Sequence, residues 1–215
     1  FNSFINRSKT NVEGIKNVDH TDIKNAKILG YKIKHLAIAE LKNNKLIQRV
    51  HPCMVTKDSY ISNINGVLNA IIIEGKPIGK FTIQGEGAGP GPTTSALVSD
   101  ICSILRGNIK YPFSTPNKNR KKITPIDISS EIFSSYIRLD VVDKTGVLSS
   151  ITKILSKNKI SVKRLIQNPF KSKRFASIII ISHKTKNSNL VRSINELSNK
   201  NFVINKPKFF RIEEI

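Results

Sequence analysis

The residues best suited to chemistry in this chain are the glycines of one short segment, residues 85–96. The segment reads Gly-Glu-Gly-Ala-Gly-Pro-Gly-Pro-Thr-Thr-Ser-Ala and lies between a predicted β-hairpin, residues 69–84, and a predicted helix, residues 93–106. Glycines adopt positive φ angles and let the backbone approach a ligand closely. A helix N-terminus adds unpaired N–H groups and a positive dipole end, which suit a phosphate or a carboxylate. The pattern predicts a ligand-binding loop, with a tight structural turn as the alternative.

The remaining polar residues form no comparable pattern. The histidines have neither triad nor metal-ligand spacing, so surface or core roles are expected for His20, His35, His51 and His183. Several long polar residues lack a partner at helical spacing and are expected on half-exposed strands, namely Glu13, Lys34, Lys76 and Lys80. The two cysteines lie far apart and are expected to be small buried hydrophobes of a reducing compartment, Cys53 and Cys102. No catalytic residue and no metal ligand is predicted.

The net charge of +21 and the pI of about 10.1 first suggest a nucleic-acid partner. The lysines are, however, spread along the whole chain beside abundant Asn and Ile, rather than gathered in one stripe with interleaved aromatic residues. No recognition motif of the usual kinds is present. Specific nucleic-acid binding is therefore not expected, and the charge is attributed to compositional drift of the genome.

Length and hydropathy bound the class of protein. The 215 residues suffice for one large or two small domains with genuine cores. No apolar run approaches the roughly 20 residues that span a bilayer, and no signal peptide is recognisable, so a cytoplasmic protein without a membrane partner is expected. The chain opens at Phe1 without an initiating Met, which favours a fragment of a longer protein.

The first half of the chain predicts an α+β fold in which a mixed or antiparallel sheet has helices on one face. Thr21 is a plausible N-cap for a short helix at 22–29, which Gly30 ends. Strands are predicted at 31–41 and 46–55, with Pro52 at an edge or a strand end. The hairpin and the helix that flank the glycine segment complete this half, and the apolar residues of that helix share one face, namely Leu97, Ile101, Ile104 and Leu105.

The second half predicts a linker and then a compact α/β unit. Three prolines flank a Lys/Arg-rich run between residues 108 and 134, which is typical of an extended, solvated segment. The segments that follow alternate as strand, helix, strand, strand, helix, strand at 136–142, 147–155, 160–166, 175–182, 190–197 and 202–212. The order βαββαβ is the ferredoxin-like split βαβ unit.

The glycine segment resembles the signature of bacterial homoserine dehydrogenases. It matches as Gly85-x-Gly87-Ala88-Gly89-x-x-Pro92-Thr93-x-Ser95-Ala96-x-x-x-Asp100. Upstream pieces agree, among them Glu13-Gly14-Ile15, Asp22-Ile23, the run at 29–37, Val50-His51-Pro52 and Asn69-Ala70. The resemblance extends from about residue 11 to residue 107.

The last segment resembles an ACT domain, the small regulatory fold often appended to that enzyme. Asp143-Lys144-Thr145-Gly146-Val147-Leu148 is similar to its first strand-to-helix turn, although Thr145 stands where Pro is frequent. Together the resemblances divide the chain into a substrate and dimerisation domain at 1–110, truncated at its N-terminus, a linker at 111–133 and an ACT domain at 134–215.

The resemblance implies a C-terminal portion of homoserine dehydrogenase, an oxidoreductase of threonine and methionine biosynthesis. The whole enzyme interconverts L-aspartate 4-semialdehyde and L-homoserine with NAD(P)H. In the family, the nicotinamide-binding domain and the helix bearing the catalytic lysine precede the part seen here, so this polypeptide alone is expected to be inactive. A homodimer or higher homo-oligomer is expected. The alternative is a stand-alone amino-acid-binding ACT-type module that serves in regulation or assembly.

The resemblance also assigns roles to individual residues. Gly89, with Gly87 and Ala88, is expected to contact the nicotinamide cofactor, whereas Thr93, Thr94 and Ser95 are expected to cap the following helix. At the ACT turn, Asp143, Gly146, Val147 and Leu148 are expected to bind an effector, for which threonine is the first candidate. Backbone N–H groups at such a turn suit an amino-acid carboxylate. An ordinary strand-to-helix connection is the alternative there.

Overall fold

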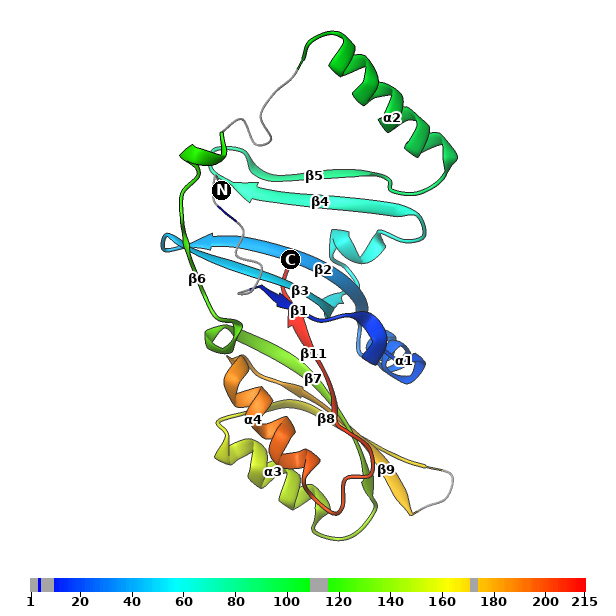
Figure 1. Cartoon of the computed structure of the whole chain (residues 1–215). Coiled ribbons are helices and arrows are strands. Elements are labelled where there is room, and N and C mark those ends of the chain that lie inside the picture. The colour runs from blue at the N-terminus through cyan, green and yellow to red at the C-terminus, as the bar shows by residue number, and fades with distance from the viewer. Residues whose placement is uncertain (1–3, 5–9, 109–115, 171–173) are drawn as a thin grey trace. The chain divides into compact units, whose positions relative to one another are not determined.

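The computed structural model describes residues 4, 10–108, 116–170 and 174–215, which form two compact units (Figure 1). The sheet unit comprises the described residues of 10–56 and 123–215, and the hairpin–helix unit comprises Phe4 and the described residues of 57–122. The predicted linker at 111–133 lies partly outside the described residues. So does the segment at 169–173, for which the sequence predicts a turn between the strands expected at 160–166 and 175–182. The domain bounds expected from the family resemblance stay a prediction.

The C-terminal part of the sheet unit has the predicted ferredoxin-like order. Its elements are β7 (Ile132–Val142), α3 (Val147–Lys157), β8 (Val162–Pro169), β9 (Phe175–Ser182), α4 (Asn187–Ser198) and β11 (Lys208–Glu213). The strands lie in the order β11-β7-β9-β8, and every neighbouring pair is antiparallel. The expected α+β fold class is thereby confirmed.

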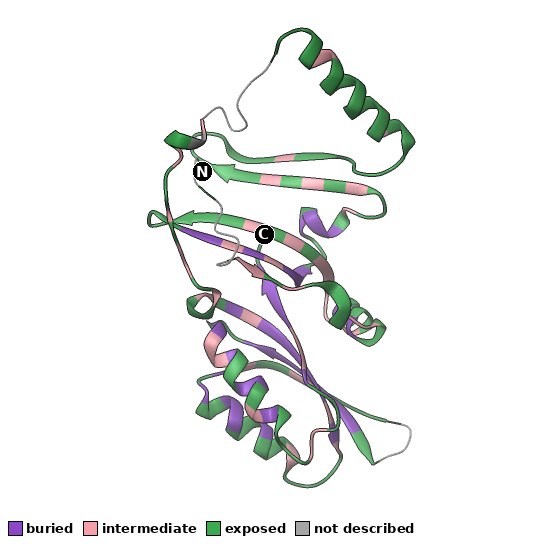
Figure 2. Ribbon diagram, in the orientation of Figure 1, coloured by how far each residue is buried: buried purple, intermediate pink, exposed green. Residues whose placement is uncertain are grey.

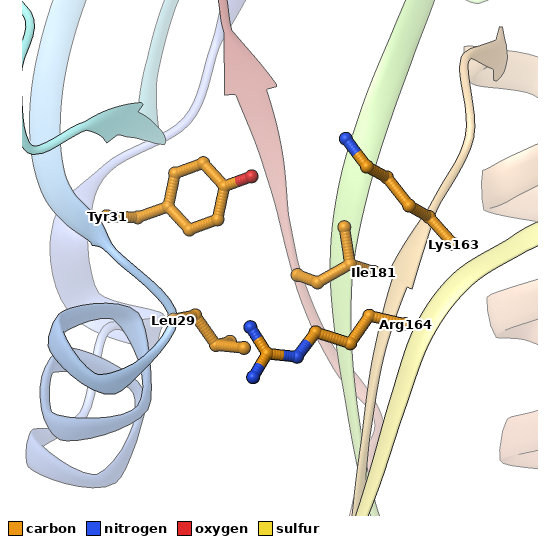
Figure 3. A pocket seen from close by; sticks show the side chains of 5 residues that line it. All are labelled: Leu29, Tyr31, Lys163, Arg164 and Ile181. Atoms are coloured by element: carbon orange, nitrogen blue, oxygen red, sulfur yellow. The ribbon is translucent and has the colours of Figure 1, made fainter.

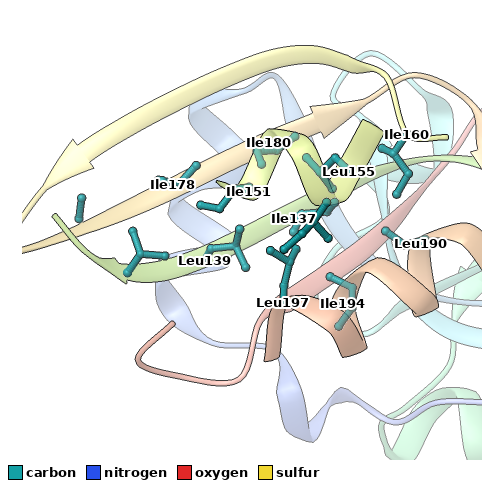
Figure 4. Close-up of a cluster of buried hydrophobic side chains, with 13 residues drawn as sticks. Ile137, Leu139, Ile151, Leu155, Ile160, Ile178, Ile180, Leu190, Ile194 and Leu197 are labelled. Carbon is teal, nitrogen blue, oxygen red and sulfur yellow. The ribbon is translucent and has the colours of Figure 1, made fainter. Parts of the chain in front are cut away.

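Strand β9 shows why this sheet is buried on both faces. Its run of four isoleucines at 178–181 has no polar alternation, which is typical of a strand covered on both sides. Ile178 and Ile180 belong to the core beneath α3 and α4, together with Leu139 and Leu155 (Figure 4). Ile179 and Ile181 belong to a second core on the opposite face. Alternate residues of one strand therefore serve two cores.

The second core is completed by the N-terminal part of the chain. Helix α1 (His20–Ile28) contributes Ala26 and strand β3 (Lys45–Thr56) contributes Met54, both at most 1% exposed. Tyr136 and Phe210 of the ferredoxin-like strands pack in the same cluster, with ring centroids 6.0 Å apart. The core therefore joins segments more than 100 residues apart in the sequence.

The two halves of the chain also share one sheet. Strand β2 (Tyr31–Lys42) pairs along its whole length with β3 across a turn at Asn43 and Asn44, both of which have positive φ. On its other side β3 runs parallel to β11, with Cys53, Met54 and Val55 opposite Arg211, Ile212 and Glu213. Short strands β1 (Asn11–Val12), β6 (Thr124–Pro125) and β10 (Thr185–Lys186) complete a nine-stranded sheet. Nothing in the sequence indicated this continuity.

Two local predictions in this unit are wrong. The N-cap of α1 is Asp19, whose carboxylate accepts a hydrogen bond from the Asp22 N–H, so the helix begins at His20 and Thr21 is no cap. Pro52 lies inside β3 rather than at its end. It falls between Val50, which pairs with β1, and Cys53, which pairs with β11. A proline, which lacks an N–H donor, is tolerated where one neighbouring strand has ended and the next has not begun.

The hairpin–helix unit has far less buried surface. It contains β4 (Leu68–Gly75), β5 (Gly79–Glu86) and α2 (Pro90–Leu105), together with short 3-10 helices at Tyr60–Asn63 and Asn117–Asn119. The sheet unit has two further 3-10 helices, Ile15–Asn17 and Ile128–Ser130. Figure 2 shows β4, β5 and α2 almost wholly as exposed or intermediate residues. Helix α2 has no buried residue. Within the described chain, no helix is long and apolar enough to cross a membrane.

Candidate functional site

The glycine loop joins β5 to α2, and two of its glycines differ in what limits a side chain at their position. Gly87 lies against the end of β4: its N–H donates to the Val67 carbonyl at 2.8 Å. A Cβ atom at Gly87 would stand 1.7 Å from Nδ2 of Asn69. A side chain at Gly87 would therefore displace the exposed Asn69 side chain from the place that it occupies here.

Gly89 is fixed by backbone conformation instead. Its φ is +116°, and among the described residues a Cβ atom at this position would meet only Cδ of Pro92, at an ordinary 3.7 Å. The residue is the N-cap of α2, which begins at Pro90 rather than at the predicted residue 93. Ala88 lies beside it in the loop, and residues 85–89 are all exposed. The backbone of the loop is thus open to a ligand at its surface.

The early start of α2 changes the chemistry expected of its N-terminus. Pro90 and Pro92 occupy the first and third helical positions, and neither has an N–H, so Gly91 is the only residue of these three that can donate. A phosphate cradle of several N–H groups is therefore not built here. Thr93, Thr94 and Ser95 lie within the helix and are not its caps.

The strand-to-helix turn after β7 has a different character. Gly146 is the N-cap of α3 with φ +87°, and no side chain caps the helix. The Asp143 carboxylate accepts a hydrogen bond from the Gln167 side chain at 3.3 Å, and its backbone N–H donates to the Arg174 carbonyl. Asp143, Gly146 and Leu148 are exposed, whereas Val147 packs partly against the core under α3 and α4. The turn combines one carboxylate with uncapped N–H groups.

The chemistry that sequence reasoning missed is a buried charge cluster at the β3–β11 pairing. Glu213 accepts hydrogen bonds from Arg49 Nε at 2.8 Å, Arg49 Nη2 at 2.9 Å and His51 Nε2 at 3.0 Å. Arg211 donates to both carboxylate oxygens of Glu13, at 2.9 and 3.1 Å, and lies 3.3 Å from His51 Nδ1. Because Arg211 can only donate, His51 Nδ1 accepts and its Nε2 donates to Glu213.

The electrostatics of this cluster follow from burial and pairing. Burial opposes ionisation of Glu213, but the hydrogen bonds from His51 and Arg49 outweigh it and lower its pKa to about 2. Burial likewise opposes the charge on Arg49, whose pKa is nevertheless raised by Glu213 and Glu40. Burial raises the pKa of the neighbouring Cys53 thiol to about 12, so this cysteine is unreactive. Glu213 and Arg49 therefore stay ionised although they are buried.

A second cluster ties α1 to β7. Asp22, which is fully buried, accepts hydrogen bonds from Tyr136 Oη at 2.9 Å and Arg138 Nε at 2.7 Å. Arg138 also contacts Asp19 and Asp140. Burial raises the pKa of Tyr136, and the neighbouring carboxylate of Asp22 raises it further. Charged side chains thus connect the helix to the ferredoxin-like sheet at its second face.

Several residues of the family-like pieces take part in these clusters. Glu13 and His51 meet at Arg211, and Asp22 meets Arg138, although long polar residues and histidines were expected in ordinary surface or core roles. His51 is indeed in the core, with no exposed surface, while Glu13 bonds to a buried arginine. The only sequence feature that could have pointed to these residues was their place in the family-like motifs, since they belong to no periodic pattern.

Comparisons with known proteins match the N-terminal part of the chain and its ferredoxin-like part separately. The family model described as homoserine dehydrogenase matches residues 1–102, and the ACT domain model matches residues 135–200. The homoserine dehydrogenase of Helicobacter pylori is 36% identical over 205 residues, which cover 94% of this chain and 48% of the relative. That of Neisseria gonorrhoeae is 34% identical and covers 86% of this chain and 44% of the relative.

A solved structure extends the match to the whole fold. The homoserine dehydrogenase of Thiobacillus denitrificans superposes with a TM-score of 0.85 at 28% identity, over all of this chain and 50% of that one. A homoserine dehydrogenase segment followed by a ferredoxin-like ACT fold defines the class. The chain belongs to the homoserine dehydrogenase family. It spans about half the length of the curated relatives that it matches.

The lowered pKa of Glu213 predicts how stability depends on pH. A carboxyl whose pKa falls on folding stabilises the protein above its unfolded value near 4.5, and this contribution disappears as the pH falls towards about 2. In urea titrations at pH 7, Glu213→Gln should be less stable than the parent by about 3 kcal/mol, because it leaves Arg49 buried beside a neutral partner. That difference should shrink steadily between pH 4.5 and pH 2.

The matched control is Glu214→Gln, which removes an exposed carboxylate paired with exposed Lys184. It should change stability by less than about 1 kcal/mol at any pH. A difference between Glu213→Gln and the parent that stays constant down to pH 2 would contradict the assignment of this carboxyl as the stabilising anion.

Proposed function

We propose that this chain forms the substrate and dimerisation part and the ACT regulatory domain of an NAD(P)-dependent homoserine dehydrogenase. The enzyme would interconvert L-aspartate 4-semialdehyde and L-homoserine, with the hydride supplied by the nicotinamide. The catalytic lysine belongs to a helix outside this sequence. Under this proposal residues 1–110, 111–133 and 134–215 are the substrate domain, the linker and the ACT domain.

The observation that carries the proposal is the exposed backbone at Gly89. Its positive φ and missing side chain let a flat ring approach the start of α2, and Gly87 and Ala88 extend the same surface. A nicotinamide needs close contact and orientation rather than a phosphate cradle, which suits a helix start with prolines at 90 and 92. The loop then forms one wall of a cofactor cleft and keeps the ring in register with the substrate carbonyl.

Exposed apolar faces in the hairpin–helix unit support a homo-oligomer joined to a further domain. The hairpin pairs Ile71 with Ile83 and Ile73 with Phe81, and all of these side chains are about half exposed. The predicted apolar face of α2 is equally uncovered, with Leu105 79% exposed. Isolated two-stranded hairpins are marginally stable, and apolar patches of this kind mark interaction surfaces.

A chimera tests the enzymatic proposal. The part of the Helicobacter pylori relative that precedes the matched segment would be fused to this chain, and homoserine oxidation would be followed with NAD⁺ and NADP⁺. The chain alone should be inactive and the chimera active. In the chimera, Gly89→Ala should raise the KM for the cofactor about tenfold, because the added Cβ obstructs the closest approach of the ring and its strain at φ +116° favours a shifted loop backbone.

Gly91→Ala is the matched control, since this glycine is helical and a Cβ there meets open space. It should leave the KM for the cofactor unchanged. Activity of the chain alone, or equal effects of the two substitutions, would contradict the proposed role of the loop. A chimera that folds but is inactive would favour the stand-alone amino-acid-binding module.

We infer that the turn at 143–148 binds an amino-acid effector, with threonine the first candidate. The Asp143 carboxylate is placed to receive an ammonium group, and the uncapped N–H groups at Leu148 and the following residue suit a carboxylate. Gly146 provides the left-handed turn that brings these groups together, and Val147 anchors the helix start to the core.

Thermal unfolding of the chain with added amino acids tests this inference. Threonine should raise the melting temperature, and Asp143→Asn should remove the response because the neutral amide holds an ammonium less well. Asp58→Asn, in the other unit, is the control and should respond like the parent. No response to threonine, isoleucine or methionine would exclude effector binding at this turn.

A further inference from the structure

A cavity of about 190 Å³ lies on the face of the ferredoxin-like sheet that α3 and α4 leave free (Figure 3). It is lined by Leu29 and Tyr31, at the end of α1 and the start of β2, and by Lys163, Arg164 and Ile181 of β8 and β9. All five residues belong to the sheet unit. The cavity therefore lies between the N-terminal segment and the outer face of the ferredoxin-like sheet.

A β-bulge gives this cavity its charge. The pairing of β8 with β9 runs from Val162 opposite Ser182 to Arg164 opposite Ile181, so Lys163 is an extra residue without a partner in the ladder. In a regular strand adjacent side chains point to opposite faces, whereas a bulge re-aims one of them. Lys163 and Arg164 both line the cavity as a result.

Three polar side chains line the cavity from different sides. Figure 3 shows the Arg164 guanidinium directed towards Leu29, whereas the Lys163 ammonium and the Tyr31 hydroxyl lie away from it, beyond Ile181. Among the residues that the structure describes, neither Lys163 nor Arg164 forms an ion pair. The lining contains no acidic side chain. Two cations thus face one cavity without a counter-charge on its walls.

The composition of the walls selects the class of ligand. The Arg164 guanidinium suits a carboxylate, which it can bind through two parallel hydrogen bonds. Lys163 adds positive charge to the same lining. Leu29 and Ile181 offer apolar walls to a short aliphatic body. An engineered cavity of ~150 Å³ holds benzene, so this space accommodates a ligand of comparable size. An ammonium group would be repelled, because nothing acidic in the lining receives it.

We propose that the cavity lined by Tyr31, Lys163 and Arg164 binds a small aliphatic organic acid that lacks an ammonium group, such as a 2-oxo acid. Its charge preference is opposite to that of the turn at 143–148, where Asp143 favours an amino acid. A ligand here contacts both the α1–β2 segment and the bulged strand β8, so its binding stabilises the arrangement of the two. The proposal concerns this chain alone and does not depend on dehydrogenase activity.

Calorimetric titration of the chain tests the proposal with two probes that differ at one carbon. 4-Methyl-2-oxopentanoate and leucine share their skeleton and carboxylate, and only leucine carries an ammonium. The oxo acid should bind with a dissociation constant of about 1 mM or tighter, and leucine about tenfold more weakly. Arg164→Gln should weaken the oxo acid about tenfold, the cost of one charged hydrogen-bond partner. Lys163→Gln should weaken it less, because it removes positive charge from the lining but leaves the guanidinium in place.

Arg192→Gln on α4 and Lys153→Gln on α3 are the matched controls, because both side chains are exposed and neither lines the cavity. They should leave oxo-acid binding unchanged. Tyr31→Phe, which keeps the wall and removes one hydroxyl, should weaken binding less than Arg164→Gln.

The proposal is overturned by any of three results. These are no heat of binding with the oxo acid, equal affinity for leucine, or equal loss in the control variants. Inorganic phosphate that binds as tightly as the oxo acid would show a site for anions in general and would equally contradict it. Failure of the chimera to oxidise homoserine leaves these measurements unaffected, so the two proposals fail separately.

Discussion

The pairing of β3 with β11 is the constraint on which the sheet unit depends. Three residue pairs join the N-terminal strands to the last strand of the ferredoxin-like fold, and the carboxylate of Glu213 lies there between Arg49 and His51. A buried carboxylate is stable only with such partners, since removing one of them leaves an uncompensated charge. The same pairing also places α1 over the outer face of the sheet, where Met54 and Ala26 complete the second core.

This arrangement joins the ACT fold to the dehydrogenase segment within one sheet. The turn at 143–148 follows β7, which pairs with β11, and β11 in turn pairs with β3. Two strand pairings therefore connect the turn to β3. The hairpin–helix unit differs, because the apolar residues of its hairpin and of α2 lie largely exposed, as does the backbone of its glycine loop.

Much of this fold is predictable from local pattern. The continuous isoleucine run of β9 indicated a buried strand. The helical spacing of Leu190, Ile194 and Leu197 indicated α4, because the spacing of apolar residues shows which face of a helix is buried. The continuity between β3 and β11 was not predictable, since strand partners distant in sequence leave no periodic trace. The charge clusters could not be predicted from the sequence for the same reason, since the paired residues Glu13 and Arg211 are 198 residues apart. The motif singled out Gly89, whose contact with a cofactor stays a prediction. The start of α2 at Pro90 was missed, and with it the loss of N–H donors at Pro90 and Pro92.

The most direct test of the central claim is native-state hydrogen exchange of the β3 and β11 amides in the parent and in Arg49→Met. If the N-terminal strands and the ferredoxin-like strands form one cooperative sheet, Cys53–Val55 and Arg211–Glu213 should open with the same free energy, and the substitution should lower both equally. Lys184→Met, at an exposed ion pair, should lower neither. Protection that falls in β3 while β11 stays fully protected would contradict the account, because the two segments would then be separate units.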